Sequence, residues 1–92
     1  MSAVPIPPVL RSSAGGAKQL EVDGATVGEI LDGLVGAHPA LRDQLFGADG
    51  SLNRFVNIYL NDQDIRYLAD QATPVDSRDT VVILPAMAGG GA

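Results

Sequence analysis

The sequence predicts one α+β domain, a mixed β-sheet with a single main helix packed on one of its faces. Its 92 residues leave room for only one small domain. Hydrophobic residues make up 46% of the chain, which is enough for a modest core without a disulfide, since cysteine is absent. The predicted order is two strands, a helix, further strands and a last apolar strand, which is typical of helix-on-sheet packing.

An opening β-hairpin is expected in the first 22 residues. The first strand, Val4 to Leu10, is apolar and β-branched, but its three prolines predict irregular or edge pairing because proline lacks a backbone donor. Turn residues from Arg11 to Ala17 separate it from a second strand at Lys18 to Val22, in which apolar and polar side chains alternate.

The main helix is expected directly after Thr26. Thr26 and Glu29 have the spacing of a capping box, and apolar residues recur after them at helical spacing. The pair His38-Pro39 predicts the end of the helix, because the residue before a proline disfavours helical backbone. A short second helix is expected over Ala40 to Phe46.

The second half of the chain predicts two main strands. Phe55 to Leu60 is the richest strand signal, and Asn61 to Gln63 is a turn toward a short partner at Asp64 to Tyr67. An irregular crossing, Leu68 to Arg78, then leads to an apolar central strand at Thr80 to Leu84. If the first and last strands lie side by side in the middle of the sheet, this order is that of a β-grasp.

Composition excludes several classes of function. A net charge of −5 disfavours binding to nucleic acid or to an anionic membrane. The only histidine is His38, so this chain alone cannot assemble a serine–histidine–acid triad or a histidine-based metal site. The N-terminus lacks the basic region and long apolar stretch of a signal peptide, which predicts a cytoplasmic protein.

The C-terminal end is the candidate functional segment. Residues 1–86 are expected to form the β-grasp domain, and residues 87–92 a flexible tail that contains three consecutive glycines. Such a tail is either a frayed end with nothing to bury or a segment whose lack of β carbons lets its backbone thread a narrow channel in a partner. Composition leaves both interpretations open.

The residues from Val82 to Gly90 (Val-Ile-Leu-Pro-Ala-Met-Ala-Gly-Gly) resemble the C-terminal signature of the ubiquitin-like sulfur carriers, the MoaD and ThiS family. Within that family, the segment Arg54 to Tyr59, with Asn61-Asp62 after it, is most similar to the CysO-type carriers of actinobacteria. The resemblance covers nearly the whole chain and implies a ubiquitin-like β-grasp fold.

The resemblance implies a protein co-substrate, not an enzyme, with no catalytic residue and no bound metal or cofactor. In this family a ubiquitin-activating-like adenylyltransferase/sulfurtransferase uses ATP to adenylate the C-terminal glycine. Sulfide then displaces AMP to give a thiocarboxylate directly, whereas a persulfide gives an acyl disulfide from which a thiol releases the thiocarboxylate. A sulfur-accepting synthase takes this sulfur into cysteine, molybdopterin, thiamin or a thiolated secondary metabolite. The absence of cysteine fits a sulfur carried on the chain end.

The resemblance places the reactive end at Gly90, with Gly91 as the alternative, and it places Ala88 and Gly89 in the tail that enters the partner's active site. One departure from the family pattern is that Gly91 and Ala92 follow Gly90. A glycine in a peptide bond has no carboxylate to adenylate, so a peptidase is expected to trim this end first.

The docking surface is expected on the sheet face near the last strand, with Phe55, Ile58 or Leu60 as apolar contacts. The aspartates of the second half predict a solvated face that flanks turns and helps solubility; they are Asp62, Asp64, Asp70, Asp76 and Asp79. The acidic balance of the chain as a whole is expected to steer a basic partner, an effect that salt weakens. Two other functions fit the same residues. One is a ubiquitin-like modifier joined to lysines of other proteins, and the other is a non-covalent interaction domain with an inert tail.

Overall fold

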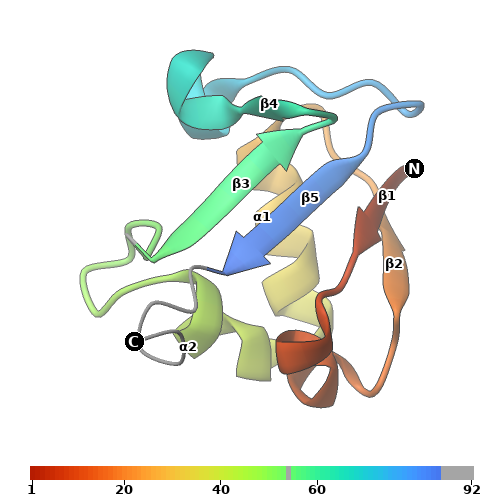
Figure 1. The fold of residues 1–92 in the computed structure, drawn as a ribbon, viewed down its shortest axis with the longest axis vertical. Coiled ribbons are helices and arrows are strands. Elements are labelled where there is room, and N and C mark those ends of the chain that lie inside the picture. Colours follow the sequence, from red (N-terminus) through yellow and green to blue (C-terminus); the bar gives the residue numbers. More distant parts are fainter. Residues whose placement is uncertain (54, 86–92) are drawn as a thin grey trace.

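The computed structural model describes residues 1–53 and 55–85, and it confirms the α+β architecture (Figure 1). The strands are β1 (Ser2–Pro5), β2 (Gln19–Val22), β3 (Val56–Leu60), β4 (Gln63–Asp64) and β5 (Val81–Pro85). The α-helices are α1 (Val27–Ala37) and α2 (Arg42–Leu45). Short 3-10 helices lie at Pro8–Ala14, Pro39–Leu41, Ile65–Tyr67 and Asp70–Ala72.

The strands follow the spatial order β2-β1-β5-β3-β4 (Figure 1). β1 pairs with β2 in antiparallel fashion, and β3 lies between β4 and β5, antiparallel to both. Ala3 of β1 forms a parallel bridge with Thr80, the residue before β5, so the first and last strands run side by side in the same direction. The chain between them supplies the crossover that a parallel pair needs, and the arrangement is a β-grasp.

Helix α1 packs against one face of this sheet (Figure 1). The capping box is confirmed, because Thr26 Oγ1 accepts the Glu29 N–H at 3.2 Å and Glu29 Oε1 accepts the Ala25 N–H at 3.0 Å. The helix ends at Ala37, before the predicted His38-Pro39 stop. Its buried side chains are Val27, Ile30, Leu31, Leu34 and Val35.

The core lies between α1 and the inner face of the sheet. The inward side chains of the central strands are fully buried there, as Val4, Ile58, Val81 and Ile83 show. Leu41 and Leu45, from the region predicted as a second short helix, close the same core at one end.

The first predicted strand is shorter than expected. Residues Val4 to Leu10 were assigned to one strand, but β1 ends at Pro5 and the chain turns into a 3-10 helix at Pro8–Ala14. The prolines explain the difference, because they offer no N–H to continue the ladder and Pro8 suits the start of a helical turn. Only Ile6 extends the pairing, by donating to the Lys18 carbonyl at 2.9 Å.

The short partner predicted at Asp64 to Tyr67 is also different. β4 spans only Gln63–Asp64, and Ile65–Tyr67 is a 3-10 turn. Asp64 causes the change, because its side chain accepts the backbone N–H of Arg66 at 2.9 Å and so caps the turn.

Candidate docking face and chain terminus

The outer face of the sheet, opposite α1, is formed mainly by β3 and β5. Asn57 and Tyr59 of β3 point outward and lie opposite Leu84 and Val82 of β5. Leu84 is 45% exposed, while Tyr59 and Val82 are half-buried. The centre of the sheet therefore presents an apolar surface to solvent.

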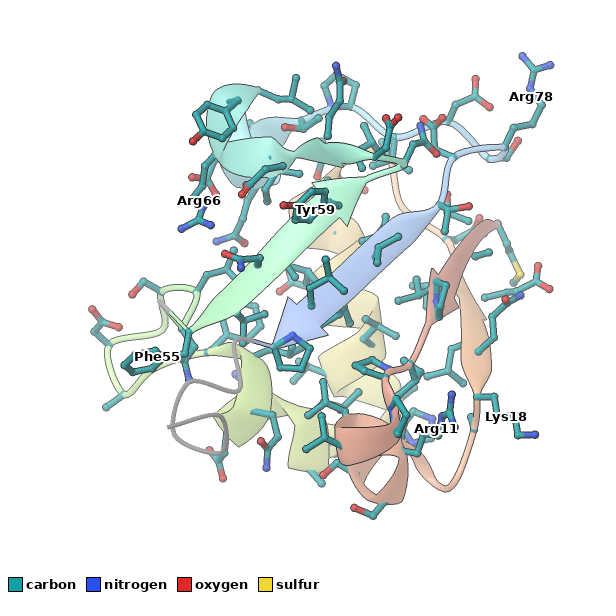
Figure 2. All side chains as sticks on the ribbon, in the orientation of Figure 1. Arg11, Lys18, Phe55, Tyr59, Arg66 and Arg78 are labelled. Carbon is teal, nitrogen blue, oxygen red and sulfur yellow. The ribbon has the colours of Figure 1, made fainter. Side chains whose placement is uncertain are left out.

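Phe55 extends this surface beyond the start of β3 (Figure 2). Its side chain is 56% exposed, and its backbone N–H donates to Asn53 Oδ1 at 3.0 Å, which fixes the turn before the strand. Val56 lies opposite Pro85, so Phe55 is at the end of the sheet from which residues 86–92 continue. We call the surface formed by Phe55, Tyr59, Val82 and Leu84 the docking face.

The three residues predicted as docking contacts have different surroundings. Phe55 is exposed, and Leu60 is half-buried and packs against the core. Ile58 is only 2% exposed, so its assignment to the surface is wrong. Ile58 alternates with Asn57 and Tyr59 along the strand, and this alternation points Ile58 toward α1.

Leu84 and Tyr59 are surface residues that the sequence interpretation did not single out. Asn57 could have identified Tyr59 from the sequence, because a polar side chain in an otherwise apolar strand marks the solvent face. Tyr59 is two residues further along the strand and therefore lies on the same face. Antiparallel pairing then places Leu84 on the same face, but register cannot be obtained from one strand alone.

Arg66 borders the docking face beside β3 (Figure 2). Its guanidinium group donates from Nη2 to Asp64 Oδ2 at 3.0 Å and from Nε to Asp64 Oδ1 at 3.3 Å. Nη2 also donates to the Asn57 side-chain oxygen. The hydrogen bonds from Arg66 hold the pKa of Asp64 below its usual value, and the same contact raises the pKa of Arg66. These contacts place the Arg66 guanidinium beside Asn57 and Asp64.

The predicted reactive end lies outside the described residues. This applies to Gly90, to its alternative Gly91, and to Ala88 and Gly89 in the tail, so their roles remain predictions. Over residues 1–53 and 55–85, no group of three or more acidic or histidine side chains is placed to hold a metal ion. None of the helices in this part of the chain is long and apolar enough to cross a membrane.

The β-grasp order and the single covering helix define the class as a small ubiquitin-like protein, and solved structures share this fold. A chain of the Amycolatopsis orientalis BexX/CysO complex superposes with a TM-score of 0.86 and 40% sequence identity. The superposition covers 94% of this chain and 96% of that one.

The sequence model of the ThiS family matches residues 5–90. The protein therefore belongs to the ThiS family. The sulfur carrier protein CysO of Mycobacterium tuberculosis is 40% identical over 89 residues, which are 95% of this chain and 96% of that protein. Small archaeal modifier protein 1 of Haloferax volcanii is 40% identical over 73 residues, covering 78% of this chain and 79% of that protein.

Proposed function

We propose that this protein is a sulfur carrier whose reactive group is the carboxylate of its C-terminal glycine. The observation that carries the proposal is the 40% identity, over 95% of this chain, with CysO proteins that are sulfur carriers by name. The family match, which runs to Gly90, supports it. Two glycines before a free carboxylate let the backbone approach a partner's catalytic groups closely, because no β carbon intervenes.

The chemistry needs two steps on the partner enzyme. An oxygen of the glycine carboxylate attacks the α-phosphorus of ATP, and pyrophosphate leaves. Sulfide then attacks the acyl carbon, and AMP departs with that oxygen, so the chain ends in a thiocarboxylate. Because the sequence continues past Gly90, the proposal includes a peptidase that cleaves after Gly90, or after Gly91 if Gly91 is the reactive end. ATP is used by the activating enzyme, and this chain supplies the acyl group.

The docking face is the surface we assign to the activating enzyme. Its exposed apolar side chains, Phe55 and Leu84, lie at the end of the sheet from which the tail continues, so a partner bound there is within reach of the glycines. The CysO structure with which this chain shares 40% identity was solved as a complex with BexX, which supports docking on a protein partner. A sulfur-accepting synthase is the second partner that we propose for the carrier.

Reconstitution tests the proposal. Chains ending at Gly90, Gly91 and Ala92 are each incubated with ATP, sulfide and the ubiquitin-activating-like enzyme of the same cells, and their intact masses are measured. We expect the chain ending at Gly90 to gain the mass difference between sulfur and oxygen, and only when ATP is present. Failure of both the Gly90 and the Gly91 chains, while both remain folded, would refute the proposal.

Protein modification is a second candidate, favoured by the 40% identity to small archaeal modifier protein 1. Both functions use an activated glycine, so they are separated by the product. A modifier gives isopeptide adducts on lysines of other proteins, whereas a sulfur carrier gives a thiolated small molecule. Mass spectrometry of adducts from cells that express the chain with an affinity tag at its N-terminus distinguishes the two.

A further inference from the structure

A hollow of about 240 Å³ lies beside the first half of β3. β4 pairs only with Tyr59 and Leu60, so within the described residues Val56 to Ile58 have no strand partner on that side. Three side chains lining the hollow, Val56, Ile58 and Ile65, belong to the buried core. The hollow therefore has an apolar floor at an open sheet edge.

Three of the described side chains at the rim of the hollow are charged, and within that part of the chain one of the three has no charged partner. Asp64 and Arg66 neutralise each other through the ion pair of 3.0 Å. Asp70 is exposed, and its carboxylate makes no ion pair or hydrogen bond with any other described residue. The hollow thus combines an apolar floor with a carboxylate at its rim that has no partner among residues 1–53 and 55–85.

The apolar floor and the Asp70 carboxylate together determine which chemical group binds best in the hollow. A carboxylate is repelled by Asp70. A purely apolar group would displace water from the Asp70 carboxylate without donating a hydrogen bond in its place. A lysine or arginine side chain meets both needs, because its alkyl stem packs on apolar surface while its charged head stays near the rim. The net charge of −5 favours the approach of such a group.

We propose that this hollow receives a lysine or arginine side chain of the activating enzyme, next to the docking face. The identity of that partner rests on the proposed function, but the cationic preference of the hollow does not. Asn53, which lines the hollow, accepts the backbone N–H of Phe55 at 3.0 Å, so the hollow and the docking face share one turn. A partner bound at Phe55 therefore lies next to the hollow.

A titration of the isolated protein tests the preference directly. n-Butylguanidinium is added to isotope-labelled protein and compared with n-butylurea, a neutral molecule of nearly the same shape. We expect only the cation to shift the amide signals of Ile58, Ile65 and Asp70 in a saturable way. Equal shifts with both probes, or shifts spread over the whole surface, would overturn the proposal.

Two matched variants distinguish a local effect of the Asp70 charge on probe binding from an effect of the net charge of the protein. Asp70 has a φ of 54°, a backbone conformation that asparagine also tolerates, so Asp70→Asn removes the charge without new strain. It should weaken n-butylguanidinium binding about three- to fivefold, as expected for one exposed ion pair. Asp62→Asn makes the same charge change at an exposed turn residue outside the hollow and should leave binding unchanged. Equal effects of the two variants would overturn the proposal.

The same variants extend the test to the partner. In the reconstituted thiocarboxylation, Asp70→Asn should raise KM for the carrier about three- to fivefold without changing kcat, while Asp62→Asn should not. An unchanged KM for Asp70→Asn would refute the partner assignment. If even the unaltered carrier gains no sulfur, the proposed function fails, whereas the probe titration, which needs neither ATP nor enzyme, still decides the chemistry of the hollow.

Discussion

At the scale of single residues, neighbouring side chains of β3 lie on opposite faces of the sheet. Ile58 faces α1 and is buried, whereas Asn57 and Tyr59 on either side of it face solvent. The same division holds in β5, where Ile83 is buried and Leu84 is 45% exposed. Because strand side chains alternate between faces, one segment supplies both the core and the docking face.

This division predicts opposite effects of two similar truncations. Ile58→Ala should lower the free energy of unfolding by about 2–5 kcal/mol, because it opens a cavity in the core. Leu84→Ala should change it by less than about 0.5 kcal/mol but raise KM for thiocarboxylation by roughly fivefold, because an apolar contact with the partner is lost. Urea unfolding and the reconstituted assay measure the two quantities. A normal KM for Leu84→Ala would place the docking site elsewhere.

At the scale of elements, the packing of α1 on β2 depends on a glycine. A β carbon added to Gly33 would lie 2.5 Å from Val22 Cγ1 of β2, which is closer than such atoms approach. A β carbon on Gly36, in the same helix, would meet nothing within 4 Å. Gly33 therefore serves packing, while Gly36 only lowers the helical preference of its segment.

Alanine at these two positions should act in opposite directions. Gly33→Ala should destabilise the fold by about 1–2 kcal/mol, because overpacking outweighs the gain in helix propensity. Gly36→Ala should stabilise it by about 0.5–1 kcal/mol through propensity alone. Thermal and urea unfolding of both variants provide the measurement. Stabilisation by both substitutions would mean that β2 can move away from α1 at little cost.

The crossing before β5 is tied to the β3–β4 turn by Asp79. Its carboxylate accepts the Asp76 backbone N–H at 2.8 Å and the Asn61 side-chain amide at 3.2 Å, and these bonds hold the pKa of Asp79 below its ordinary value. A carboxyl whose pKa is lower in the folded state stabilises the fold above its unfolded pKa, about 3.9, and loses that contribution as pH falls through the lower value.

Asp79→Asn should therefore reduce the loss of stability on acidification. Stability at neutral pH should fall slightly, and the decline between about pH 5 and about pH 2 should become shallower than in the unaltered protein. Unfolding free energies across that range provide the measurement. An identical decline in both proteins would show that this carboxylate contributes nothing to the acid sensitivity.

Local sequence signals predicted the elements well where one residue determines the backbone. The Thr26 capping box placed the start of α1, and the hairpin and the parallel first and last strands are confirmed. Asp64 was not recognised as the cap of a 3-10 turn, so β4 is shorter than expected. Asn57 marks the solvent face of β3, but which residues of β5 lie beside it depends on the register between the two strands, which is a long-range property. The docking face was therefore only partly predicted.

At the scale of the whole molecule, three acidic residues and two basic residues lie at opposite ends of the sheet. Asp62, Asp76 and Asp79 belong to the turn after β3 and the crossing before β5, so they lie at the end of the sheet far from Pro85. Arg11 and Lys18 lie at the end from which the chain continues (Figure 2). Under the proposed function, these two cations would reduce the repulsion between the acidic carrier and the phosphates of ATP in the activating enzyme.

Intact mass spectrometry of the protein isolated from its own cells tests the sulfur-carrier function. We expect a chain that ends at Gly90, or at Gly91, and that is heavier than the corresponding carboxylate by the difference between one sulfur and one oxygen atom. A chain that keeps Ala92, and that stays unmodified after incubation with ATP, sulfide and the activating enzyme, would contradict it. In that case a non-covalent interaction domain with an inert tail would be the better explanation.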